Sequence, residues 1–399
     1  MKQVASRIST YSADVFGVCS ALYELGGMVV MHDPSGCNST YTTHDEPRWS
    51  SMESMIFISG LTEMEAIMGD DEKLIADVVR EADAMHPAFI VVAGGPISNM
   101  IGLDFEAVSL RIEEETGIPS IGISTNGMNS YVDGASRAFL KIAERFVNKD
   151  PKKTADPSVN ILGLTPLDFS LNGEAEDIRR FAQKLGFSVL STWAMGTTLE
   201  DIQKSSDAWV NLVVSADGLA VAEWMQRQWE IPYVVGVPFG HYEKERIEKE
   251  LLDAVWKTAD SSHAVNIKSI LRNPILERIE LKEEERERFS GRRTVIIGEG
   301  VRSVSLAREW EARYGTPVGV ICATEAMGDY LRPGDAQATD EDEILPLVAD
   351  AEVVIADPLY RPILPSGCDF VSLPHVGFSG RTFADRIPNL VKNSQWKWN

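Results

Sequence analysis

Short apolar runs alternate with amphipathic stretches along almost the whole chain, in three blocks separated by polar segments. Brief runs rich in β-branched residues are typical of strands buried on both faces. Apolar positions spaced three and four apart are typical of helices that cover a sheet. Strands that alternate with helices predict parallel sheets. The pattern therefore predicts an α/β protein built from several sheet-and-helix units.

The blocks predict three domains, at residues 1–150, 158–290 and 291–399. A polar, proline-bearing linker, residues 148–157, separates the first two. We expect three doubly wound, Rossmann-like domains whose parallel sheets surround a central cleft. The predicted strands are 28–31, 55–59, 89–93, 120–124, 159–164, 188–193, 212–215, 233–237, 294–297, 318–322, 353–356 and 370–372. The predicted helices are 71–84, 104–116, 132–146, 175–185, 219–229, 275–289 and 304–314.

The net charge of the chain limits the classes of macromolecule that it is expected to bind. The 60 acidic residues outnumber the 38 basic ones, and the net charge of −22 disfavours binding to nucleic acid or to an anionic membrane surface. No apolar run is long enough to span a bilayer, and no apolar signal core follows Met1. The four cysteines form no disulfide framework. We therefore expect a cytoplasmic protein.

Cys19 and Cys37 are the chief chemical candidates. Cys37 ends the turn His32-Asp33-Pro34-Ser35-Gly36-Cys37, directly after a predicted strand, at the edge where open α/β sheets bind ligands. Two thiolates at such an edge would suit a soft metal or an iron–sulfur cluster. Cys19 follows Val18, and taken alone this position favours a buried core residue. Cys322 ends an apolar strand and is expected in the core, whereas Cys368 lies in a loop with no assigned role.

Nucleotide chemistry is disfavoured. Gly298-Glu299-Gly300 follows a strand and precedes a helix, but the third glycine of a dinucleotide fingerprint is missing, which favours a simple tight turn. No Walker A sequence occurs in the chain.

Several segments together resemble the nitrogenase component 1 family, which includes dark-operative protochlorophyllide and chlorophyllide reductases and a nickel-tetrapyrrole reductive cyclase. The turn that ends at Cys37 is similar to the family's His-Gly-Pro-x-Gly-Cys turn, with Asp33 in place of glycine. Further similar segments are Leu61-Thr62-Glu63, Gly69 to Leu74, Pro96 to Asp104, Val159 to Gly163, Ile231-Pro232-Tyr233, Pro238-Phe239-Gly240 and Gly377 to Gly380.

The resemblance implies that Cys19 and Cys37 ligate the cluster that receives electrons. Gly95 stands where the family has its third cysteine, so one chain offers two thiolates to a cluster that takes four. A homodimer would bring two copies of each cysteine together and complete one shared [4Fe–4S] cluster. Asp33 would either ligate or tune the cluster, or cap the turn.

The resemblance also implies that two proteins carry out the reaction together. A separate iron-protein-like ATPase would deliver low-potential electrons, and the chain would pass them to a small-molecule substrate. His44, Glu46 and Arg48 follow Cys37 closely and are the candidates for proton relay and for binding a carboxylate; the alternative is a polar surface loop. Two other functions stay open: a non-catalytic scaffold that assembles or stores a metallocluster, and an α/β ligand-binding protein without a cluster.

The iron–molybdenum cofactor of the nitrogenase catalytic subunit is held by one Cys and one His. The Cys would fall near Val214-Ser215-Ala216, where the chain has no thiol. His375 lies close to the position of the histidine but out of clean register. The resemblance therefore does not extend to dinitrogen reduction with that cofactor.

Overall fold

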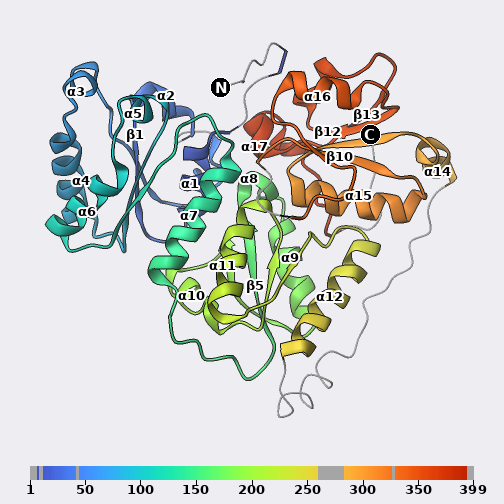
Figure 1. Cartoon of the computed structure of the whole chain (residues 1–399), viewed down its shortest axis with the longest axis horizontal. Coiled ribbons are helices and arrows are strands. Elements are labelled where there is room, and N and C mark those ends of the chain that lie inside the picture. Colours follow the sequence, from blue (N-terminus) through green and yellow to red (C-terminus); the bar gives the residue numbers. More distant parts are fainter. Residues whose placement is uncertain (1–6, 9–11, 42–44, 259–282, 326–328, 393–399) are drawn as a thin grey trace.

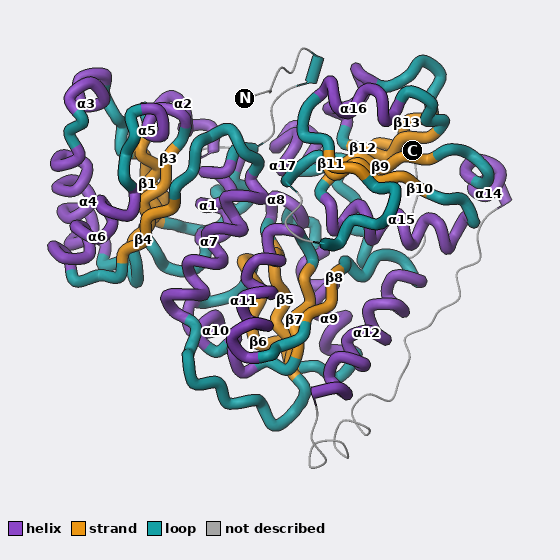
Figure 2. Tube along the Cα trace, in the orientation of Figure 1, coloured by secondary structure: helices purple, strands orange, loops and turns teal. Residues whose placement is uncertain are grey.

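The computed structural model describes residues 7–8, 12–41, 45–258, 283–325 and 329–392. Three separate parallel β-sheets, each with helices around it, follow one another along the chain (Figures 1 and 2). This arrangement confirms the predicted α/β class. Each sheet falls within one of the three predicted domain ranges, whose limits stay a prediction.

The first sheet has the strand order β2-β1-β3-β4, and every pair is parallel. All residues of its two central strands are buried, as expected for apolar runs covered on both faces. The strands are β1 (Met28–His32), β2 (Met55–Ile58), β3 (Ile90–Gly94) and β4 (Ser120–Ile123). The helices are α1 (Asp14–Leu22), α2 (Ser35–Thr40), α3 (Glu63–Met68), α4 (Asp71–Met85), α5 (Pro96–Met100), α6 (Phe105–Thr116) and α7 (Tyr131–Phe146).

The second sheet has the order β6-β5-β7-β8. Its strands are β5 (Ser158–Leu164), β6 (Ser188–Ala194), β7 (Val210–Val213) and β8 (Tyr233–Val235). Its α-helices are α8 (Pro166–Phe169), α9 (Glu174–Lys184), α10 (Leu199–Gln203), α11 (Leu219–Trp229) and α12 (Tyr242–Thr258), with short 3-10 turns η2 (Ser205–Asp207) and η3 (Ala216–Gly218).

The third sheet has the order β11-β10-β9-β12-β13. Its strands are β9 (Thr294–Gly298), β10 (Val318–Cys322), β11 (Ala336–Gln337), β12 (Val353–Ala356) and β13 (Asp369–Ser372). Its helices are α14 (Glu283–Phe289), α15 (Gly300–Tyr314), α16 (Glu341–Val348) and α17 (Val376–Ser379), with 3-10 turns η4 (Pro358–Ile363) and η5 (Gly380–Arg386).

Helix α7 joins the first two units, because it packs against α1 on one side and against η3 and α11 of the second unit on the other (Figure 1). Helix α15 of the third unit packs against α12 of the second. Helices α8 and α17 also contact each other, close to the carboxyl ends of β5 and β9. We call this region the junction of the three units.

The apolar pattern does not predict α1 or α12. Eight of the nine residues of α1 are buried, so the helix shows no polar face by which its period could be recognised. The predicted helix 275–289 falls largely on residues outside the described part, within which α14 begins at Glu283. Among the described residues, no helix combines the length and the apolar character that crossing a membrane requires.

Candidate functional site

Cys19 lies on α1 and has no solvent-exposed surface in the single chain. Burial, with a smaller contribution from the nearby Glu46 carboxylate, raises the pKa of the thiol well above its usual range. The side chain is therefore a neutral thiol in the isolated chain, and a metal ion would have to displace its proton in order to bind.

The groups next to Cys19 form a buried ion-pair network. Arg48 Nε donates to Glu46 Oε1 at 2.6 Å, and Arg48 Nη1 donates to Glu24 Oε1 at 3.0 Å. Arg48 Nη2 donates to the backbone oxygen of Ser20 at 2.8 Å, which ties the network to α1. The Tyr41 hydroxyl donates to Glu46 Oε2 at 2.7 Å. Glu46 and Arg48 thus lie close to Cys19, and the chain itself already binds the Arg48 guanidinium on all three nitrogens.

The other two predicted site residues are placed only in part. Cys37 lies within the short helix α2, so the predicted turn is a helical one, and its side chain is not among the described ones. His44 falls outside the described residues. The assignment of His44, Glu46 and Arg48 to catalysis stays a prediction.

Gly95 stands where the family resemblance places a third cysteine, and the Asp33 side chain occupies the space that the cysteine side chain would need. A Cβ atom on Gly95 would lie 2.0 Å from Asp33 Oδ2, so no larger residue fits there without moving the carboxylate. The Asp33 side chain is fully buried; it accepts hydrogen bonds from Ser98 N and Asn38 Nδ2, both at 3.3 Å. Asp33 therefore ties the start of α5 to the turn after β1, whereas the capping alternative has it cap its own turn.

The described residues of one chain form no complete cluster site. No group of three or more His, Cys, Asp or Glu side chains suited to a metal ion occurs among the described residues. With Gly95 and Asp33 closing the third position, the donor set fits half of a cubane and not the whole. Cys19 is the one described member of that half.

A second group of polar side chains lies at the junction of the three units, centred on Asp168. Tyr131 of α7 donates to Asp168 Oδ1 at 2.6 Å, and Ser215 donates to Asp168 Oδ2 at 2.7 Å. His375 Nε2 lies 3.0 Å from Asp168 Oδ1. Burial opposes ionisation of Asp168, but the His375 hydrogen bond and charge outweigh it and lower the pKa of the carboxyl.

Two further buried acids adjoin this group. Glu299 caps α15 by accepting from Val301 N and Arg302 N, and it also accepts from Ala216 N at 3.0 Å. Burial and the negative charge of Asp168 raise the pKa of Glu299 to about 7. Burial and the same negative charge also raise the pKa of Asp217 well above its usual range. Burial at this junction therefore favours the protonated forms of the Glu299 and Asp217 carboxyls over their charged forms.

A cavity of about 30 Å³ lies beside this group and is lined by Glu299, Arg302, Asp357 and His375. A space of that size holds one or two water molecules. His375 Nδ1 has no hydrogen-bond partner within the described residues, so a water there would satisfy it.

The sequence reasoning missed the centre of this group. Ser215 and His375 lie near the positions where the family resemblance places the cofactor Cys and His, His375 out of clean register, and the structure shows that both contact one carboxylate. Asp168 was not predicted, although it follows β5 closely, at the edge of the sheet where ligand-binding residues are expected. No pattern in the sequence pointed to Tyr131, because this residue lies at the start of α7, a helix of the first unit.

The Gly298-Glu299-Gly300 turn is a helix cap, since Glu299 accepts from the backbone N–H groups that a phosphate would otherwise contact. Cys322 is fully buried, as predicted, and Cys368 is partly exposed.

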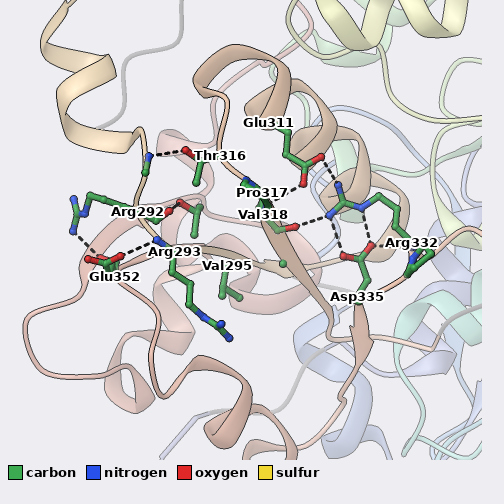
Figure 3. Close-up of a pocket in the computed structure, with 15 residues that line it drawn as sticks. Arg292, Arg293, Val295, Glu311, Thr316, Pro317, Val318, Arg332, Asp335 and Glu352 are labelled. Carbon is green, nitrogen blue, oxygen red and sulfur yellow. Dashed lines mark hydrogen bonds and ion pairs between the residues drawn. The ribbon is translucent and has the colours of Figure 1, made fainter.

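A pocket of about 740 Å³ in the third unit lies away from both groups, where β9 and β10 begin (Figure 3). Its Arg332 is held by Glu311 and Asp335 and by Val318 O. These contacts, visible in Figure 3, point to a structural role for the pocket wall.

The sequence model of the nitrogenase component 1 type oxidoreductases matches residues 15–358. One polypeptide of the light-independent protochlorophyllide reductase of Picosynechococcus sp. is 23% identical over 309 residues, covering 73% of this chain and 59% of that protein. Its counterpart from Nostoc punctiforme is 28% identical over 196 residues, covering 47% of this chain and 39% of that protein. The chain thus matches less than two thirds of the length of these two relatives.

The nitrogenase iron-molybdenum cofactor biosynthesis protein NifE of Clostridium pasteurianum is 26% identical over 313 residues, covering 75% of this chain and 65% of that protein. Among solved structures, nitrogenase Cp1 at pH 5 superimposes with a TM-score of 0.68 at 17% identity, covering 99% of this chain and 88% of that one. The structural likeness shows a shared fold.

Proposed function

Since the chain belongs to the family of nitrogenase component 1 type oxidoreductases, we propose that it is the catalytic component of a two-component reductase. An iron-protein-like ATPase delivers low-potential electrons to a [4Fe–4S] cluster shared by two copies of the chain, for reduction of a small-molecule substrate. The observation that carries the proposal is the position of Cys19, buried beside Glu46 and near Tyr41, the residue that follows α2, within a family match that covers most of the chain.

Cys19 and Cys37 of each chain would hold the cluster. When bound, the cluster supplies one-electron transfer at low potential. The blocked third position at Gly95 supports two ligands from each chain, because Asp33 leaves no room there for a thiol. The Cys19 side chain has no exposed surface in the single chain. The proposal therefore requires the residues packed around Cys19 to move when two chains associate, so that the thiol can reach the cluster. A reducing cytoplasm suits these free thiols.

Reduction of an unsaturated substrate consumes protons as well as electrons. We assign proton relay to His44 and Glu46, with Arg48 positioning the Glu46 carboxylate through the contact at 2.6 Å. The group around Asp168 is a second candidate proton store, since burial raises the pKa of Glu299 to about 7 and the pKa of Asp217 well above its usual range, and both lie within the junction of the units.

The proposal is tested by loading the protein with iron and sulfide under anaerobic conditions. We expect about four irons per two chains and an electron paramagnetic resonance signal after reduction, both lost in Cys19→Ala and in Cys37→Ala. Cys368→Ala is the matched control, because Cys368 lies in the third unit and should leave the iron content unchanged. An iron-free dimer after reconstitution, or full iron content in Cys19→Ala, would contradict the cluster site.

The relative NifE favours one other function, a scaffold that assembles or stores a metallocluster for a different enzyme. Turnover of a candidate tetrapyrrole with a cognate ATPase and dithionite would support the reductase. Transfer of bound metal to an apo-partner, without turnover, would support the scaffold.

A further inference from the structure

A pocket of about 480 Å³ lies between the second and third units, where β8 ends against α15. Its size is that of a small-molecule site, and interdomain clefts are frequent places for such sites. Its apolar lining includes Tyr233, Leu331 and Pro333. Its charged lining consists of three arginines, Arg246, Arg308 and Arg332, and two acids, Glu250 and Asp329.

Two of the arginines are held by acids of the same chain. Arg246 makes a two-pronged contact with Glu243, at 2.8 and 2.6 Å, and a third contact with Glu250 at 2.7 Å. Arg332 is bound by Asp335 and Glu311. Both guanidinium groups are therefore largely neutralised within the protein.

Arg308 differs from Arg246 and Arg332 because no acid of the described residues binds it closely. Its one ion pair within the described residues is a long contact, 3.7 Å from Nη1 to Glu243 Oε1, and Glu243 is already bound to Arg246. No hydrogen bond from the Arg308 guanidinium to any described residue meets normal geometry, although two thirds of the side chain is buried, with 34% exposed. A half-buried guanidinium with free donors is poised for an oxyanion, which it binds through two parallel hydrogen bonds.

The surroundings of Arg308 disfavour its positive charge. Burial, together with the positive charge of Arg246, lowers the pKa of Arg308. A bound anion would reverse both effects, because it compensates for lost solvation and shields one arginine from the other.

We propose that this pocket is a binding site for a small organic anion, with Arg308 as the residue that holds its carboxylate or phosphate group and the Tyr233 and Leu331 side chains as the contact for its apolar part. Neither Cys19 nor Asp168, Tyr131, Ser215 or His375 lines this pocket. It is formed by β8, α12 and α15, so a ligand there would contact both units.

The test is a calorimetric titration of the whole chain with inorganic phosphate and, in a parallel experiment, with succinate, at constant ionic strength. We expect saturable binding of at least one of them, weakened roughly 10- to 100-fold in Arg308→Gln, which corresponds to the loss of a charge-assisted contact. The tighter of the two probes identifies the oxyanion class. Arg80→Gln is the matched control, because Arg80 is an exposed arginine on α4, far along the chain from the pocket.

Arg308→Gln leaves Glu243 bound to Arg246, so the fold should persist; Arg308→Lys keeps the charge and should retain part of the affinity. Equal affinity in the wild type and in Arg308→Gln would overturn the proposal, and so would the absence of binding by either probe. Neither result depends on iron, so the outcome is independent of the proposed reductase function.

Discussion

At the scale of single residues, burial decides which groups are charged. His32 ends β1 with 4% of its surface exposed, and its Nδ1 lies 2.9 Å from Ser59 Oγ. Burial lowers the pKa of the imidazole from 6.5 to about 4. The native protein therefore keeps His32 neutral at pH values where the unfolded chain would protonate it.

This shift predicts a loss of stability in acid. Below pH 6.5 the unfolded state binds a proton that the native state refuses, so the contribution of His32 to the free energy of unfolding falls as the pH drops from 6.5 towards 4. We expect His32→Gln to reduce the difference in unfolding free energy between pH 7 and pH 4.5 by about 2 kcal/mol. Urea unfolding at both pH values measures it, and an unchanged difference would refute the buried neutral state.

At the scale of elements, two glycines allow α1 and α7 to pack closely. A Cβ atom on Gly17 would lie 1.9 Å from the backbone oxygen of Tyr131, and one on Gly134 would lie 1.8 Å from the backbone oxygen of Asp14. Backbone atoms cannot yield as a flexible side chain can, so only glycine fits at either position. This contact positions Cys19 on α1 and Tyr131 on α7, and thereby links the two candidate groups.

We expect Gly134→Ala to lower the free energy of unfolding by about 1–3 kcal/mol or more, because the helices must separate to admit the methyl group. Gly36→Ala is the control: Gly36 lies in helix α2, and no atom of the described residues lies within 4 Å of the added Cβ, so the change should stay below about 1 kcal/mol. Chemical denaturation of both variants makes the comparison. Equal effects of the two substitutions would show that the helix crossing tolerates a side chain.

At the scale of the whole molecule, Asp168 connects all three units. The carboxylate lies in the second unit and binds Tyr131 of the first and His375 of the third, as well as Ser215 of its own unit. A buried pair between Arg302 and Glu174, 3.2 Å apart, also joins the second and third units. Polar contacts at the junction thus fix the relative placement of the sheets, in addition to apolar packing.

Removal of this carboxylate should loosen the junction. In Asp168→Ala the Tyr131 hydroxyl, the Ser215 hydroxyl and His375 Nε2 lose their shared acceptor, and we expect a loss of about 3 kcal/mol in the free energy of unfolding. Hydrogen exchange should increase in α7 and α17 together. Asp350→Ala, which removes an exposed partner of Arg293, should cost less than about 1 kcal/mol. Faster exchange in only one unit would contradict the role of Asp168 as a shared contact.

The sequence by itself determined the described strands except β11, the helices α4, α6, α7, α9, α11 and α15, and the parallel character of the sheets, because apolar periodicity and turn chemistry are local properties of the chain. Through the family resemblance it also drew attention to Ser215 and His375, which lie near the positions of the two cofactor ligands. The tertiary structure alone decided that Cys19 is sealed beside Glu46, that Asp33 fills the space above Gly95, that Asp168 gathers side chains from three units, and that Arg308 keeps free donors. Each of these depends on how elements distant in sequence pack together, which no local pattern encodes.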